Sequence, residues 1–268
     1  MTSSPLKSTS SENSWDHVHK QTSVFDARAG YDRIALAYDG SPWRRFWKKN
    51  EYPIVKRIFL RLLHKYNFQR AIDIGAGTGF YTRFIENYVP EVVGVDISSK
   101  MLFVAQKKSN GTLVNEDFVK FREFGKFDFA ISARTLSHIY DMEGFFRSID
   151  QNTAEDACVI LTDIHPKHNY YKTQFEFGSE IVEIETYKHI TRNIVESITR
   201  NVSDQIWYKE YDFRSLQDKW ISTEFRSVVN SVDPIFYIIL IKKGAALEPG
   251  VSGYMRNVLN FHSYAGTG

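Results

Sequence analysis

The chain changes its hydrophobic rhythm near residue 70, and this change predicts where helices give way to strands. Residues 54–63 carry apolar side chains at the three- and four-residue spacing of an amphipathic helix. Pro53 suits the first turn of that helix. Between residues 70 and 163, short apolar runs such as RAIDIG and EVVGVDIS alternate with helical stretches such as GFYTRFIENYV and SKMLFVAQKKS. This alternation predicts a mostly parallel sheet with helices on both faces.

The segments on either side of this region follow other patterns. Residues 24–40 predict one or two short helices. After residue 165, apolar positions alternate on both sides of a Gly-Ser pair at residues 178–179, which predicts an inserted β-hairpin. Two late strands follow, QIWYKEYDF and PIFYIILIKK, and the second is apolar enough to be buried. We therefore expect a Rossmann-like α/β domain at residues 22–243, with a helical lid at 22–66 and an inserted cap at 165–187.

The two ends of the chain lack such patterns. Residues 1–21 are rich in serine and threonine and poor in apolar residues, which predicts a disordered segment. They contain no apolar stretch of the kind that a secretory signal requires. Residues 244–268 are rich in glycine and predict a loosely held tail. No run of the sequence approaches the roughly 20 apolar residues of a membrane span, so we expect no integral membrane association.

Composition and charge narrow the range of partners and compartments that the chain can have. The net charge is +2, from 34 basic and 32 acidic residues, so no overall basicity favours a nucleic acid partner. The single cysteine, Cys158, lies in the apolar run ACVILTD and predicts a buried thiol and a reducing, cytoplasmic location. Residues 44–70 hold nine Lys and Arg with Glu51 as the lone acid. This run fits a solvated helix face by default or, alternatively, the binding of an acidic substrate, an acyl carrier protein or a membrane surface.

A glycine-rich turn follows the first strand of the alternating region. Gly75, Gly77 and Gly79 are spaced as GxGxG, whereas a dinucleotide-binding turn would place its third glycine where Phe80 stands. Asp73 precedes the turn by two residues, and its carboxylate would repel a pyrophosphate. A ligand with a positive end suits this acid better. S-adenosylmethionine carries both an ammonium and a sulfonium group, so the turn favours this ligand.

Acidic residues also follow the next two strands, where the carboxyl ends of parallel strands line a crevice. Asp96 ends the second strand, and its carboxylate can accept both hydroxyls of a ribose. NAD sites use such an acid too, so Asp96 alone does not separate the two cofactors. In NEDF, after the third strand, Asp117 can accept an adenine amino group, and the neighbouring Glu116 could serve instead. Phe118 can lie beside the adenine ring.

The motifs DIGAGTG, GVDIS, NEDF and FDFAIS, in this order, resemble those of the class I S-adenosylmethionine-dependent methyltransferases over roughly residues 31–243. The chain is similar to the small-molecule branch that includes the ubiquinone and menaquinone C-methyltransferases. The leader YDRIALAYD, at residues 31–39, resembles the segment that closes over the cofactor there. The resemblance implies a seven-stranded sheet with an antiparallel last strand. It also implies Asp73 and Gly75 at the amino acid end of the cofactor, and Ala133 and Arg134 along its methionine part.

The motifs and the resemblance together give one set of candidate cofactor contacts. For the two tyrosines in this set, packing of a surface helix is an equally good explanation. The set comprises Tyr31, Tyr38, Asp73, Gly75, Ala76, Gly77, Gly79, Asp96, Ile97, Met101, Asp117, Phe118, Ala133 and Arg134.

Two histidines and an aspartate are candidates for the chemistry. His138 follows the fourth predicted strand and His165 follows the fifth, and either imidazole could remove a proton from a hydroxyl or an amine. His138 could instead be structural, and Asp163 could orient His165 or contact the acceptor. The aromatic segment Tyr170, Tyr171, Phe175, Phe177 and Tyr187 could wall a pocket or pack on itself. No His, Asp and Glu have metal-ligand spacing, so we predict no required metal.

The leading hypothesis is a methyltransferase that acts on an oxygen or nitrogen of a small molecule, as a monomer or homodimer, in specialised metabolism. C-methylation of a quinone-like ring is an alternative within the same class. A protein that binds S-adenosylmethionine without transferring its methyl, either a cyclase-type enzyme or a regulatory module, is the alternative from another class. A nucleic acid substrate is disfavoured, because SART stands where amine-modifying nucleic acid methyltransferases carry (D/N)PP(Y/F).

Overall fold

The computed structural model describes residues 21–122, 125–168, 171–177, 180–203, 205–216, 233–244 and 256–257. The segment predicted to be disordered lies outside these residues except for Gln21, and so does the predicted tail except for residues 244, 256 and 257. Tyr170 and the Gly-Ser pair of the predicted hairpin are also outside the described part.

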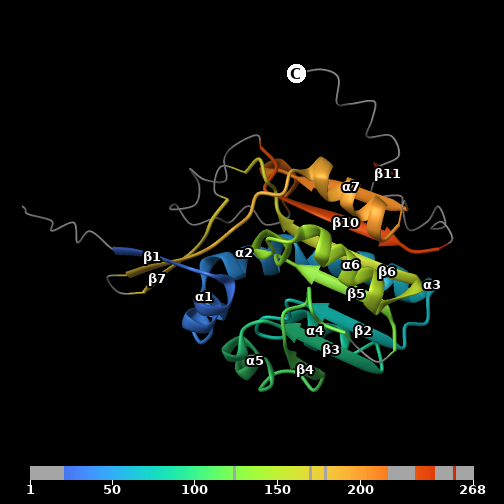
Figure 1. The fold of residues 1–268 in the computed structure, drawn as a ribbon, viewed down its shortest axis with the longest axis horizontal. Helices are drawn as coiled ribbons and strands as arrows, with labels where there is room; N and C mark the ends of the chain where they lie inside the picture. Colours follow the sequence, from blue (N-terminus) through green and yellow to red (C-terminus); the bar gives the residue numbers. More distant parts are fainter. Residues whose placement is uncertain are drawn as a thin grey trace, which may run out of the picture.

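One large sheet forms the centre of the molecule (Figure 1). Its strands, in spatial order, are β11 (Arg256–Asn257), β9 (Ile206–Tyr211), β10 (Phe236–Lys242), β6 (Thr153–Ile164), β5 (Phe127–Ala133), β2 (Arg70–Ile74), β3 (Glu91–Asp96) and β4 (Thr112–Asn115). The pairs from β6 to β4 are parallel, whereas β10 is antiparallel to both β6 and β9. The expected seven-stranded sheet with an antiparallel last strand is therefore confirmed. The two-residue strand β11 extends its edge.

Helices cover both faces of this sheet. On one face, apolar side chains of α2 (Pro42–Asn50), α3 (Tyr52–Lys65) and α4 (Phe80–Ile85) join a core cluster with the strands. On the other face, α6 (Met142–Asn152) and α7 (Thr191–Asn201) form the second cluster and lie side by side (Figure 1). The strands of the centre are apolar on both sides because both sides are covered.

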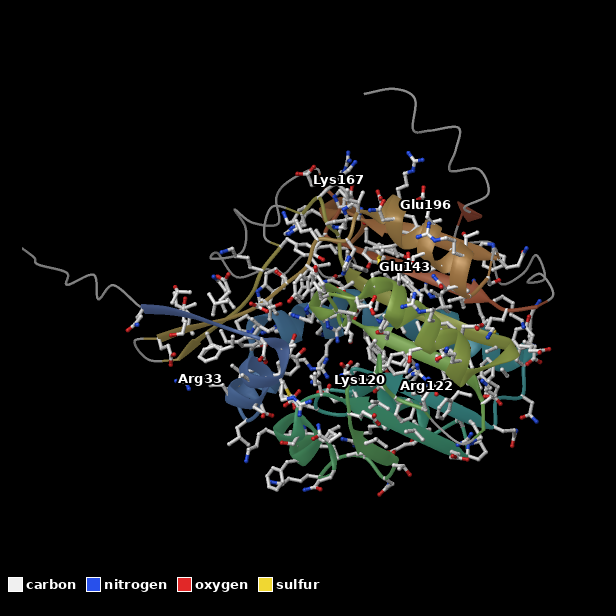
Figure 2. All side chains as sticks on the ribbon, in the orientation of Figure 1. Arg33, Lys120, Arg122, Glu143, Lys167 and Glu196 are labelled. Atoms are coloured by element: carbon white, nitrogen blue, oxygen red, sulfur yellow. The ribbon has the colours of Figure 1, made fainter. Side chains whose placement is uncertain are left out.

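A second, smaller sheet lies beside the first and projects from the body of the domain (Figure 1). The predicted hairpin is present as β7 (Thr173–Phe177) and β8 (Glu180–Ile184), which pair antiparallel. The sequence did not predict β1 (Gln21–Phe25), which pairs parallel with β8 and replaces the beginning of the expected helical region. Figure 2 shows Arg33 next to this sheet, where its guanidinium forms an ion pair with Glu180 at 2.7 Å.

The helices that follow β1 connect the small sheet to the body. α1 (Ala27–Ile34) is capped by the Asp26 side chain, and α2 is capped by Ser41. α5 (Ser99–Ala105) packs against α1, and Met101 joins Ile34 and Ile184 in a third apolar cluster. The 3₁₀ turns are η1 (Tyr38–Gly40), η2 (Leu136–His138) and η3 (Phe213–Ser215). No helix of the described part of the chain is long and apolar enough to cross a membrane.

The aromatic core under α3 yields a stability prediction. Phe59 is 1% exposed, and the centroid of its ring lies 5.2 Å from the ring centroid of Phe84 and 4.9 Å from that of Phe129. Replacing Phe59 by alanine removes these contacts and leaves a cavity, so we expect the free energy of unfolding to fall by about 3–5 kcal/mol. Leu60→Ala is the matched control, because Leu60 is 36% exposed and its loss should change stability by about 0.5 kcal/mol or less. Urea denaturation measures both variants, and equal effects would contradict the described packing.

Candidate active site

A cavity opens at the carboxyl ends of β2, β3 and β5, and we call it the first cavity. This is the edge of a parallel sheet at which ligands bind in open α/β folds. Of the candidate cofactor contacts, all but Gly79 line it, and so does one candidate base. These lining residues are Tyr31, Tyr38, Asp73, Gly75, Ala76, Gly77, Asp96, Ile97, Met101, Asp117, Phe118, Ala133, Arg134 and His138.

The three glycines of the turn all have positive φ angles, between 55° and 77°, which L side chains rarely adopt. A methyl group on Gly75 would lie 2.1 Å from Oγ1 of Thr135, and one on Gly79 would lie 2.9 Å from Cβ of Ala105. These two glycines therefore permit close packing of the turn against its neighbours. At Gly77 the nearest atom would be 3.9 Å away, so this glycine keeps the floor of the first cavity open to a ligand.

Two carboxylates hold the turn in place. Asp73 is 2% exposed, and its Oδ2 accepts hydrogen bonds from the amide and the hydroxyl of Thr82, both at 2.7 Å. Asp96 accepts from the amide of Gly77 at 2.7 Å and from that of Ser98 at 2.8 Å. Burial raises the pKa of each carboxyl to about 6. Both groups remain ionised at neutral pH, so the cavity holds negative charge beside the glycine turn.

The far end of the first cavity is formed by residues after β4 and by α5. Asp117 and Glu116 both line it, so the structure leaves open which of them would meet an adenine. Oδ1 of Asp117 also accepts a hydrogen bond from the amide of Val119 at 3.0 Å. Phe118 and Met101 are 5% and 1% exposed and supply apolar surface for a flat ring.

Tyr31 and His138 meet at the rim of the first cavity. Nδ1 of His138 lies 2.7 Å from the backbone oxygen of Glu185, which can only accept, so Nδ1 carries the proton. Nε2 is then the acceptor, and the Tyr31 hydroxyl donates to it at 2.8 Å. Burial lowers the pKa of His138 to about 4 and raises that of Tyr31. The imidazole is therefore neutral above about pH 5, with its lone pair directed at the Tyr31 hydroxyl.

The structure does not bring the other two catalytic candidates to this cavity. His165 is 1% exposed and accepts at Nδ1 from the amide of Lys167, and its Nε2 lies 3.0 Å from Oε1 of Glu210. The carboxylate of Asp163 accepts from the amide and the hydroxyl of Ser137, at 2.7 and 3.0 Å. Asp163 thus holds η2, the turn that carries His138. Of the three catalytic candidates, His138 is the one in the described lining of the first cavity.

A second cavity adjoins the first, between α2 and β7, and shares five lining residues with it. Most of the second cavity's other walls come from α2, the turn η2 and the start of β7. Its lining residues are Tyr31, Tyr38, Ser41, Trp43, Arg44, Trp47, Arg134, Ser137, His138, Ile164, Lys172, Thr173, Gln174 and Phe175. Of the predicted aromatic wall, Phe175 is placed here, whereas Tyr171 is buried and donates its hydroxyl to the backbone oxygen of Tyr187 at 2.9 Å.

Sequence reasoning missed several residues of the first cavity, and Arg44 is the clearest case. It belongs to the basic run for which a solvated helix face was expected, yet it is 3% exposed and lines both cavities. Its guanidinium lies 4.1 Å above the ring of Phe80 and pairs with Asp39 at 3.3 Å. The remaining missed residues of the first cavity are Ala27, Thr78, Phe80, Tyr81, Val95, Thr135 and Ile139.

The other sequence predictions about chemistry concern residues away from both cavities. Cys158 is fully buried, and burial raises the pKa of its thiol to about 12, as expected of a structural thiol. Within the described ranges, no three His, Cys, Asp or Glu side chains are grouped so that they could hold a metal ion. That no metal is required stays a prediction.

Comparison with known proteins agrees with this geometry. Residues 72–161, which run from β2 into β6, match the family described as "Methyltransferase domain". These residues are therefore similar to a methyltransferase domain. The glycine turn, Asp96 and η2 all lie inside the matched residues.

Individual relatives of the methyltransferase domain are distant. The chain is 30% identical over 116 residues to "Probable S-adenosylmethionine-dependent methyltransferase CRG1" of Saccharomyces cerevisiae, covering 40% of this chain and 39% of the yeast protein. It is 26% identical over 174 residues to phosphoethanolamine N-methyltransferase 1 of Zea mays, covering 58% of this chain and 34% of the maize protein. The chain thus spans well under half the length of the curated relatives that it matches.

A solved structure shares the fold. Phosphoethanolamine N-methyltransferase 2 of Haemonchus contortus, in complex with phosphomonomethylethanolamine and S-adenosylhomocysteine, superposes with a TM-score of 0.57 at 18% identity. The match covers 80% of this chain and 58% of the nematode protein. At this identity the likeness establishes the fold of the methyltransferase domain.

The environment of His138 yields a pH prediction. Its imidazole should stay neutral from pH 8 down to about pH 5, since burial lowers its pKa to about 4, below the ordinary 6.5. The unfolded chain takes up this proton first as the pH falls, so the contribution of His138 to the free energy of unfolding declines between pH 6.5 and 4.

NMR titration of the imidazole Cε1 proton measures this value, and the resonance is identified by its loss in His138→Gln. A midpoint near 6.5 would show that the imidazole is not enclosed as described.

Proposed function

We propose that this chain transfers a methyl group from S-adenosylmethionine to an oxygen or nitrogen of a small-molecule acceptor. One observation carries the proposal: a cavity at the carboxyl edge of the sheet joins an open glycine turn, the carboxylates of Asp73 and Asp96, and a neutral histidine. The methyltransferase domain match supports the reaction class.

The residues of the first cavity fit the donor chemically. The unobstructed space above Gly77 leaves room for a ligand against the turn. Asp96 has lone pairs beyond those used by the amides of Gly77 and Ser98, and these can accept ribose hydroxyls. Asp73 would attract the donor's ammonium group, while Phe118 and Met101 would enclose its adenine. When bound, S-adenosylmethionine supplies a methyl group that its sulfonium makes electrophilic.

The chain's own part in the reaction is to position the acceptor and to remove its proton. The second cavity shares Tyr31, Tyr38 and His138 with the first, so an acceptor held there would lie beside the donor. The single Nε2 lone pair of His138 accepts the hydrogen bond of the Tyr31 hydroxyl, so a proton from the acceptor would reach it through Tyr31. The Tyr31 oxygen would take the proton of an acceptor hydroxyl or amine while it passes its own proton to Nε2.

Transfer to nitrogen or oxygen, rather than carbon, is supported by two facts. An amine nitrogen or a hydroxyl oxygen has a lone pair that can attack the methyl group before its proton leaves, so a base as weak as the buried His138 would be sufficient. Two of the relatives reported above are named as N-methyltransferases. The quinone-type resemblance has no such support.

Donor binding can be tested through Asp96. Asp96→Asn removes the negative charge that would accept the ribose hydroxyls, so we expect the affinity for S-adenosylhomocysteine to fall at least about tenfold. Asp156→Asn is the matched control, because Asp156 is an exposed residue of β6 and lines neither cavity. Isothermal titration calorimetry at pH 7.5 measures both, and failure of the parent protein to bind would refute the proposed function.

Turnover tests the pairing of Tyr31 with His138. With a productive acceptor, Tyr31→Phe and His138→Gln should each lower kcat, while the affinity for S-adenosylhomocysteine should change less. Because the two side chains act through one hydrogen bond, the double variant should lose less than the product of the single losses, with a coupling of about 0.5–3 kcal/mol.

Release of S-adenosylhomocysteine measures the rate. If the losses of kcat in the two single variants multiply in the double variant, Tyr31 and His138 act independently. If no acceptor is turned over, a protein that binds S-adenosylmethionine without transferring its methyl is favoured instead.

A further inference from the structure

Arg134 has two features that mark it as a ligand-binding residue. Its φ angle is 59°, and it is the one residue other than glycine with positive φ among those that the structure describes. Such a backbone costs free energy in a residue with a long side chain and concentrates at functional sites. The residue follows β5, and its amide donates to the backbone oxygen of Thr162 at 2.7 Å.

Part of the guanidinium of Arg134 makes no hydrogen bond to the described residues. Nη1 forms an ion pair with Glu51, whereas neither Nε nor Nη2 has a hydrogen-bond partner among the described residues. Nε and Nη2 together form one edge of the planar group, the edge that grips a carboxylate or phosphate through two parallel hydrogen bonds. Nε is also shielded from solvent, and a buried donor without a partner is unfavourable. A bound anion would remove this cost.

The charges around the two cavities differ in sign. The first cavity is lined by four acidic residues, Asp73, Asp96, Glu116 and Asp117, which outnumber the two arginines that it shares with the second cavity. The described lining of the second cavity contains no carboxylate, and it contains Arg44, Arg134 and Lys172. The first set suits a cationic donor, and the second set suits an anion placed next to it.

Lys172 lines only the second cavity, and its present partner is weakly held. Its ammonium lies 3.1 Å from Oε2 of Glu183, and the lysine side chain is 54% exposed. Exposed ion pairs contribute little stability, so Lys172 can turn to a ligand at small cost. Arg134, in contrast, is fixed by Glu51 and presents its free edge without rearrangement.

We propose that the methyl acceptor carries an anionic group, a carboxylate or a phosphate, which Arg134 and Lys172 bind in the second cavity. This inference rests on the proposed function. The rings of Trp43, Trp47 and Phe175 lie in the same lining and would contact the apolar part of the acceptor. Anchoring one end by charge leaves the nucleophilic end to face His138 at the junction.

The test uses phenyl phosphate as the anionic probe and benzyl alcohol as the neutral one. Each is titrated by calorimetry into the full chain, with and without saturating S-adenosylhomocysteine. We expect phenyl phosphate to bind at least tenfold more tightly than benzyl alcohol. Two variants should each weaken phenyl phosphate binding about fivefold or more. One is Lys172→Met. The other is Arg134→Lys, which keeps the positive charge beside Glu51 but loses the bidentate edge formed by Nε and Nη2.

Lys167→Met is the matched control, because Lys167 is exposed and lines neither cavity. Its affinity for phenyl phosphate should equal that of the parent. Equal binding of the two probes, or unchanged binding in Lys172→Met, would overturn the inference.

Arg134→Lys also distinguishes whether Arg134 binds the anionic group of the acceptor or the carboxylate of the donor. If this variant loses affinity for S-adenosylhomocysteine and keeps it for phenyl phosphate, the free edge binds the donor's carboxylate and the inference is wrong. If S-adenosylhomocysteine does not bind the parent at all, the proposed function fails, while the titrations without it still decide whether the second cavity binds an anion.

Discussion

The ion pair between Glu51 and Arg134 connects the parts of the molecule that meet at the two cavities. Glu51 is 1% exposed at the start of α3, and it also accepts from the hydroxyls of Thr162 at 3.0 Å and Tyr81 at 3.1 Å. One carboxylate therefore joins α3, α4, β6 and the turn after β5. Removing one member of a buried pair leaves an uncompensated charge, which costs about 3–5 kcal/mol. The pair therefore adds little net stability to the fold, but it holds the guanidinium of Arg134 in one position.

The order of the strands explains why both cavities form where they do. From β2, the chain moves outward to β3 and β4, and then returns to β5 and β6 on the other side of β2. The turns after β2 and β5 therefore diverge and leave a crevice at the carboxyl edge. Acids from the β2–β4 side line one part of it, and η2 after β5 supplies His138. The separation of charge between the cavities follows from this topology.

The features that were predicted correctly from the sequence are those that depend on local sequence patterns. The glycine turn, Asp73 and Asp96 were found because their spacing relative to strands determines where they lie. β1 was missed because its partner β8 is more than 150 residues away, and its burial pattern does not alternate cleanly. Arg44 was missed because only tertiary packing over Phe80 buries its guanidinium. His165 follows the correct strand, but strand position does not give side-chain direction, and its ring turns to β9.

The parallel pairing of β1 with β8 has a mechanical consequence. The segment before α1 and the hairpin of β7 and β8 are far apart along the chain, yet they share one sheet. α1 contributes Tyr31 to both cavities, and β7 contributes Phe175 to the second. The two covers are therefore parts of one hydrogen-bonded sheet. A displacement of either cover would carry the other with it, so access to the two cavities is mechanically coupled.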